Sequence, residues 1–247
     1  MKYHYVLLLL FFQLHNYVCG SKPQSSNHLI QEGEKHFKNL RQLTFSGENA
    51  EAYFSSDGKK LILQAHEGDS LCDQIYIMNI ASGSTEMVST GNGVTTCSFF
   101  QYPDDDGIIY ASTHLANSDC PPKPDYSMGY IWKLYEGYDI FKASMDGSNL
   151  QRLTDTPGYD AEATFSFDGQ RIIYTSLESG DLDLWSMNSD GSEKQQLTNR
   201  LGYDGGAFYS YDGSKIVWRA YYPESKKEIA DYETLLSENA IRPMALQ

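Results

Sequence analysis

Short apolar runs separated by Asp-Gly pairs dominate the pattern of this chain. One series of Asp-Gly pairs, at residues 57–58, 106–107, 168–169 and 212–213, recurs at intervals of 49, 62 and 44 residues, and an apolar run follows each pair. A second series of turns lies between them, at Ser-Gly 82–83 and at Asp-Gly 146–147 and 190–191. Asp-Gly favours tight hairpin turns because Gly adopts positive φ and the Asp side chain bonds nearby backbone. The pattern therefore predicts short strands joined by hairpins, in a unit of about 44 residues with an insertion in the middle interval.

The clearest unit is predicted to contain four strands, at residues 162–167, 170–176, 181–187 and 194–198. Four short strands in 40 to 45 residues is typical of one β-propeller blade. The runs LIL (61–63), RIIY (171–174) and KIVW (215–218) do not alternate with polar residues, as expected for strands covered on both faces by neighbouring blades. Helical repeats of similar length are excluded, since two Asp-Gly turns per unit would interrupt their helices.

The repeat resembles that of the TolB family, which also occurs in the propeller domains of prolyl-oligopeptidase-type peptidases. The resemblance lies in A-x-F-S-x-D-G-x-x-I-x-Y-x-S at residues 163–176 and D-L-x-x-M-N-x-D-G-S-x-x-x-Q-L-T at residues 183–198, and it covers about residues 40–220. It implies an all-β propeller of four-stranded antiparallel blades, usually extracytoplasmic, that binds partners through its faces and central channel. Such a fold does not by itself imply an activity.

The chain divides into four regions. Residues 1–20 carry one Lys before a short apolar core and are predicted to be a secretory signal peptide, with a buried terminal element or a lipid-attached Cys19 as alternatives. A polar linker at 21–39 precedes the blades at 40–221, which begin with a fourth-type strand near residues 39–44. Residues 222–247 are predicted to be a helical insertion followed by the start of a further strand.

About three and a half blades are expected, which leaves the propeller incomplete. Three full units begin near Ala50, Thr95 and Ala161, and half a unit begins at Ala207. An open arc exposes strand edges and an apolar blade face. We therefore expect a fragment of a longer propeller protein, or an arc that closes by dimerisation.

Charge and cysteine content narrow the function further. A net charge of -14 and no cluster of Lys and Arg argue against nucleic-acid binding. Beyond the signal region, Cys72, Cys97 and Cys120 allow one disulfide and one free thiol, as suits an exported protein, and the spacing leaves the pairing open. A zinc site that includes His114 is disfavoured because the chain has no C-x-x-C pattern.

Acidic residues just before or within the predicted inner strands are the first candidate site. The repeat places Asn49 and Glu51 in register with Asp160 and Glu162, and Asp204 in register with Asp160. Because first strands line a propeller channel, these oxygens are candidates for a ligand or a cation such as Ca2+. The alternative is that each Asp caps its own loop as a repeated Asx turn.

The insertion at residues 114–138 is the second candidate site. It is rich in proline and carries the aromatic residues Tyr126, Tyr130, Trp132 and Tyr135. Prolines lower the entropy lost on binding, and exposed aromatic rings provide contact area, so a protein or glycan partner is one expectation. Packing of the insertion over its own blade is the other.

No catalytic motif is visible. The G-x-S-x-G elbow and the H-E-x-x-H zinc motif are both absent from the sequence. We therefore expect a secreted or periplasmic, non-catalytic binding or scaffold module. The alternative is the non-catalytic propeller portion of an exported peptidase or other hydrolase.

Overall fold

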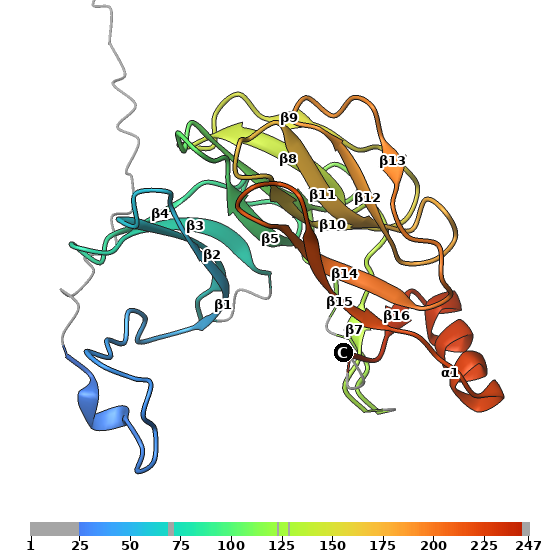
Figure 1. The fold of residues 1–247 in the computed structure, drawn as a ribbon, viewed down its shortest axis with the longest axis horizontal. Coiled ribbons are helices and arrows are strands. Elements are labelled where there is room, and N and C mark those ends of the chain that lie inside the picture. Colours follow the sequence, from blue (N-terminus) through green and yellow to red (C-terminus); the bar gives the residue numbers. More distant parts are fainter. Residues whose placement is uncertain (1–24, 69–71, 123, 128, 244–247) are drawn as a thin grey trace, which may run out of the picture.

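The computed structural model describes residues 25–68, 72–122, 124–127 and 129–243. Three complete four-stranded antiparallel sheets and half of a fourth follow one another around an arc (Figure 1). The predicted all-β propeller fold with four-stranded antiparallel blades is confirmed. The predicted signal peptide and the residues from Met244 onward lie outside the described residues.

Each complete blade pairs its strands in the order of the chain. The first blade contains β1 (Glu48–Phe54), β2 (Lys60–His66), β3 (Gln74–Asn79) and β4 (Thr85–Met87). The second contains β5 (Thr95–Phe100), β6 (Gly107–Ser112), β8 (Asp139–Ser144) and β9 (Gln151–Arg152). The third contains β10 (Asp160–Phe165), β11 (Arg171–Ser176), β12 (Asp183–Asn188) and β13 (Gln195–Gln196). The half blade contains β14 (Tyr203–Tyr209) and β15 (Ile216–Tyr221).

The hairpin turns use the chemistry that the sequence predicts. At the turn of the third blade, Gly169 has φ +69° and its N–H donates to the Ser166 carbonyl at 2.9 Å. The Ser166 hydroxyl donates to Asp168 at 2.6 Å, and Asp168 also accepts the Gln170 N–H at 3.1 Å. The Asp side chain therefore organises the turn, while Gly supplies the left-handed conformation.

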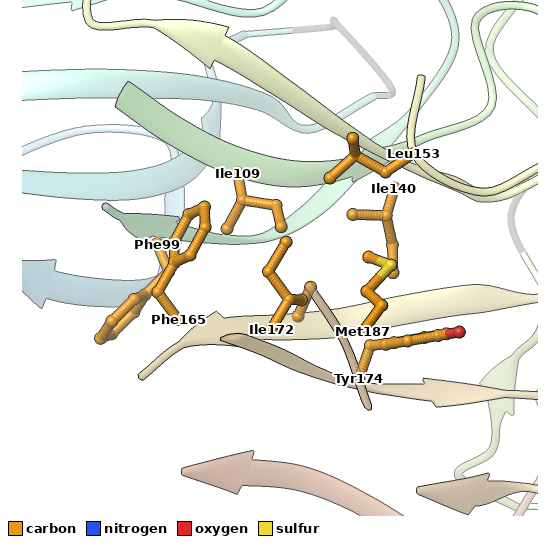
Figure 2. Close-up of a cluster of buried hydrophobic side chains, with 9 residues drawn as sticks. Phe99, Ile109, Ile140, Leu153, Phe165, Ile172, Tyr174 and Met187 are labelled. Carbon is orange, nitrogen blue, oxygen red and sulfur yellow. The ribbon is translucent and has the colours of Figure 1, made fainter. Parts of the chain in front are cut away.

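A predominantly apolar core lies between the second and third blades (Figure 2). Ile109 and Ile140 of one blade pack against Ile172 and Met187 of the next, and all four side chains are fully buried. The opposite faces of these strands are also buried, against the first blade and against the half blade, which explains why their sequences do not alternate.

The C-terminal part, here called the C-terminal unit, packs against the insertion, the third blade and the half blade. Helix α1 (Lys226–Ser237) begins at the N-cap Ser225, whose side chain bonds the Glu228 N–H while Glu228 bonds back, a capping box. This confirms the predicted helix. After it, β16 (Ala240–Ile241) pairs with β7 (Trp132–Lys133) of the insertion, an arrangement that the sequence did not predict.

Two boundaries differ from the prediction. The first strand of the half blade begins at Tyr203 rather than near Ala207, since the pairing with β15 starts at Tyr203 and Tyr221. Near residues 39–44 the structure has an isolated bridge between Arg41 and Ser25 instead of a fourth-type strand. A fourth strand needs a third strand beside it, and within the described ranges none lies next to this segment. A short 3-10 helix, η1 (Asn27–Leu29), precedes it.

Candidate functional site

The first strand of every blade contains a β-bulge at the same position. The four bulge residues adopt left-handed conformations: Glu51 at φ 52°, Cys97 at 52°, Glu162 at 57° and Gly206 at 58°. At each of them the pairing register with the second strand shifts. A bulge re-aims side chains, and all four residues line one pocket of about 290 Å3, here called the channel pocket.

Glu162 is the most strongly held side chain of the channel pocket. It is 8% exposed and accepts hydrogen bonds from Tyr203 Oη at 2.8 Å, Thr175 Oγ1 at 2.9 Å and the Gly206 N–H at 2.8 Å. Arg219 Nη2 forms an ion pair with Glu162 Oε1 at 3.0 Å. Burial, followed by the charge of Glu162, raises the pKa of Tyr203, so this hydroxyl remains a donor. A buried carboxylate is thus compensated from three strands.

Gly206 makes room for the arginine. A Cβ at this position would lie 2.6 Å from the Nη2 atom of Arg219. The guanidinium therefore occupies the space that a bulge side chain fills in the other blades. On the same guanidinium, Cζ lies 5.3 Å from the ring centroid of Trp132, which brings the insertion into contact with the half blade.

Glu51 and Cys97 are held differently. Glu51 is exposed and accepts one hydrogen bond, from Tyr53 Oη at 2.8 Å. The Cys97 N–H donates to Gln64 Oε1 of the neighbouring blade at 3.1 Å. Burial, reinforced by the charges of Glu162 and Glu51, raises the pKa of the Cys97 thiol well above its usual range, so the sulfur remains protonated.

The structure separates the remaining acidic candidates from the channel pocket. Asp160 and Asp204 are buried, at 1% and 0% exposure, and neither lines the pocket. Asp204 Oδ1 accepts hydrogen bonds from Trp218 Nε1 at 2.8 Å and Tyr222 Oη at 2.6 Å. The exposed Asn49 donates to the Ser46 carbonyl at 2.9 Å. Of the five predicted residues, Glu51 and Glu162 are therefore the two that meet in one pocket.

Asp160 is an unusual buried carboxylate. Neither of its oxygens has a partner at hydrogen-bonding geometry in the described part of the chain. Burial raises the pKa of Asp160 to about 6, while the nearby Ser176 and Thr154 hydroxyls act in the opposite direction. Across the described ranges, no group of three or more His, Cys, Asp or Glu side chains is arranged to hold a metal ion.

The insertion is anchored at both of its ends. Cys120 forms a disulfide with Cys72 of the first blade, which resolves the pairing that the sequence left open, and Cys97 is free. Strand β7 pairs with β16, and the Tyr135 hydroxyl donates to the Pro122 carbonyl at 3.1 Å. The disulfide ties the insertion to the first blade, β7 ties it to the C-terminal unit, and the Tyr135 hydrogen bond holds the insertion together internally.

Two tyrosines of the insertion remain on the surface. Tyr126 and Tyr130 are 51% and 56% exposed, and their rings stack with centroids 6.1 Å apart and an interplanar angle of 19°. The Trp132 indole N–H donates to the Tyr130 hydroxyl at 3.1 Å, while Trp132 and Tyr135 themselves are half-buried. The four aromatic candidates therefore divide into an exposed pair, here called the tyrosine pair, and a supporting pair.

Sequence reasoning missed Arg219 and Tyr203. A signal for Arg219 was present, because the repeat aligns Arg219 with Thr175 and Gly206 with Glu162. An Arg that appears in one copy, next to a Gly that replaces a carboxylate, indicates an ion pair between blades. The contact between Trp132 and Arg219 had no such signal, since it joins the insertion to a strand of another blade.

Comparison with solved structures shows the fold. TolB from Acinetobacter baumannii matches with a TM-score of 0.55 and 19% identity over 72% of this chain. The chain has the TolB-type β-propeller fold. A crystal structure of a nidogen–laminin complex matches with a TM-score of 0.53 and 14% identity over 71% of the chain. Hydrazine synthase from Kuenenia stuttgartiensis matches with a TM-score of 0.53 and 12% identity over 76% of the chain.

The chain spans only part of the propeller proteins that it resembles. It covers 39% of the TolB chain, 60% of the chain in the nidogen–laminin complex and 31% of the hydrazine synthase chain. No protein-family model and no curated protein matches the sequence. Identities below 20% show the fold alone, and propellers of this kind occur both in enzymes and in binding proteins.

Proposed function

We propose that this chain is a non-catalytic, extracytoplasmic β-propeller module that binds a protein or glycan partner through its insertion. The observation that carries the proposal is the tyrosine pair, whose stacked rings are about half exposed on a segment held by a disulfide and by β7–β16 pairing. Holding an aromatic surface in place before binding lowers the entropy cost of association.

The chemistry of the tyrosine pair limits the kinds of group that it can bind. Two nearly parallel rings offer a flat, apolar surface with hydroxyl groups at its edge. Such a surface suits the apolar face of a sugar ring or the ring of a proline in a polypeptide. The prolines that precede Tyr126 in the insertion restrict φ of the backbone that leads to this surface and so limit its conformations.

Two observations support an extracytoplasmic location. The Cys72–Cys120 disulfide is of a kind that persists in oxidising compartments, and the sequence pattern of residues 1–20 is typical of a secretory signal. Among the described residues, no helix is long and apolar enough to cross a membrane.

Saturation-transfer NMR on the full chain tests the binding proposal with defined probes. Chitohexaose and cellohexaose represent glycans, and a hexaproline peptide represents a proline-rich protein. We expect transfer to at least one probe, its loss in the double variant Tyr126→Ala with Tyr130→Ala, and its retention in Tyr211→Ala, which removes an 85% exposed tyrosine elsewhere. Absence of transfer to every probe, or equal transfer in the double variant, would contradict the proposal.

A further inference from the structure

The charges of the channel pocket do not balance. Arg219 and Glu162 compensate each other at 3.0 Å. Glu51 lines the same pocket and forms no direct ion pair with a described residue, so the two carboxylates of the pocket share the single positive charge of Arg219. The protein as a whole carries a net charge of -14, so its field adds to the local negative potential. The pocket is therefore suited to a cation rather than an anion.

Glu51 has no structural task that matches that of Glu162. Glu162 accepts the bulge N–H of the next blade, from Gly206 at 2.8 Å. Between the first and second blades, Gln64 has this role instead and accepts the bulge N–H of Cys97 at 3.1 Å. The Glu51 carboxylate thus keeps open acceptor positions beside the bond from Tyr53 at 2.8 Å, although its left-handed backbone is costly for a non-glycine residue.

The channel pocket also contains a buried hydroxyl without a hydrogen-bond partner. Ser98 lines the channel pocket, is 1% exposed, and its Oγ atom has no hydrogen-bond partner in the part of the chain that the structure describes. A buried polar group left unpaired is destabilising. An N–H donor that entered the pocket would satisfy it.

Aromatic rings supply the rest of the wall. Tyr53 and Phe208 both line the channel pocket, with ring centroids 5.7 Å apart, and Phe99 packs against both of them. The faces of such rings attract cations and also pack against aliphatic chains. A cation with an alkyl stem therefore fits this wall better than a hydrated metal ion.

We propose that the channel pocket binds a primary ammonium group of a partner polypeptide, with Glu51 as its counter-ion and Ser98 as a hydrogen-bond acceptor. A divalent metal ion fits less well, since the described residues hold no group of three His, Cys, Asp or Glu side chains for it. An ammonium has three donors, and the open positions of Glu51 and Ser98 can accept two of them. The site is separate from the tyrosine pair and does not depend on the proposed function.

Calorimetric titration of the full chain at pH 7 tests the site with three small probes. Nα-acetyl-lysine amide offers only a side-chain ammonium, glycyl-norleucine amide only an N-terminal ammonium, and Nα-acetyl-norleucine amide neither. We expect one of the two amines to bind at least 10-fold more tightly than the neutral probe, and the stronger amine identifies the source of the ammonium. Equal binding of all three probes, or no binding, would overturn the inference.

Two carboxylate variants locate the binding. Glu51→Gln is expected to weaken the binding of the amine at least 10-fold. Glu48→Gln, which replaces an exposed carboxylate of the same strand outside the pocket, should change the affinity less than 2-fold. Ser98→Ala should weaken the binding of the amine 2- to 5-fold relative to wild type. Equal losses in Glu51→Gln and Glu48→Gln would show an effect of net charge alone and refute the site.

A metal control and an independent readout complete the test. Titration with CaCl2 alone should give no heat that depends on Glu51, and a Glu51-dependent calcium signal without amine binding would refute the assignment. Bound amine should raise the Tm of the wild-type chain and leave that of Glu51→Gln unchanged, as measured by thermal denaturation with and without saturating amine. An equal shift in both proteins, or none in either, would contradict binding in the channel pocket.

Discussion

Replacing Glu162 by Gln should strongly destabilise the propeller. The carboxylate accepts four hydrogen bonds, from Tyr203, Thr175, Gly206 and Arg219. A Gln keeps the shape of the side chain but places an amide donor where one of these donors now points. It also leaves the Arg219 charge without its counter-ion.

The magnitude follows from the burial of the two partners. Removing one member of a buried ion pair costs about 3–5 kcal/mol. Here Glu162 is 8% exposed in its side chain but Arg219 is 41% exposed, so water can solvate part of the guanidinium. We therefore expect a loss of about 3 kcal/mol in the free energy of unfolding, which corresponds to a fall in Tm of about 6–12 °C for a domain of this size.

Urea denaturation followed by tryptophan fluorescence measures this loss. Glu51→Gln is the matched control, because Glu51 occupies the same bulge position with the same left-handed backbone but is exposed. The control should lose less than about 0.5 kcal/mol. Equal losses in the two variants, or a loss below about 0.5 kcal/mol in Glu162→Gln, would refute the conclusion that the Glu162 network joins the third blade to the half blade.

Three further predictions concern other parts of the propeller. Burial raises the pKa of Asp160 to about 6, so the folded state retains this proton more tightly than the unfolded state and wild-type stability should fall as pH rises from about 4 to 6. Asp160→Asn should reduce that decline in urea denaturation, since burial also raises the pKa values of Asp139 and Asp181, and should stabilise the protein by about 1–3 kcal/mol at pH 7; an unchanged pH profile would contradict this. Serine at both Cys72 and Cys120, separated by 48 residues, should cost about 4 kcal/mol, and an unaltered Tm would argue against the disulfide. Gly206→Ala should cost about 1–2 kcal/mol more than Gly213→Ala, since both have positive φ but only at Gly206 does the added Cβ crowd a guanidinium; equal values would exclude that contact.

The blade architecture could be predicted because its signals are local. An Asp-Gly turn is encoded by adjacent residues, and a strand covered on both faces is encoded by an unbroken run such as 171–174. The same repeat placed Glu51 and Glu162 in one register, and the structure brings both to the channel pocket. The bulge that aims them there was not predicted, because an insertion of one residue in a strand leaves the apolar pattern almost unchanged.

What escaped prediction depends on contacts between distant parts of the chain. Glu162 and Arg219 are 57 residues apart, and β7 and β16 are two-residue strands from an insertion and a C-terminal unit. Strands this short carry no periodicity of their own, so their pairing is determined by the packing around them. The placement of Asp160 shows the same limit, since the repeat fixes its register but the neighbouring blade determines its burial.

Comparison of the four bulges separates structural roles from binding roles. The backbone repeats closely, because a left-handed residue and a register shift recur in every first strand. The side chains diverge: Glu162 is committed to joining two blades, Gly206 admits an arginine, and Cys97 remains a protonated thiol. Glu51 alone combines the bulge geometry with a carboxylate that forms no direct ion pair with a described residue. Cys97 and Gly206 maintain the same bulge without a carboxylate, and Glu51 does not accept the bulge N–H of the next blade as Glu162 does. The Glu51 carboxylate is therefore better explained by what it binds than by what it stabilises.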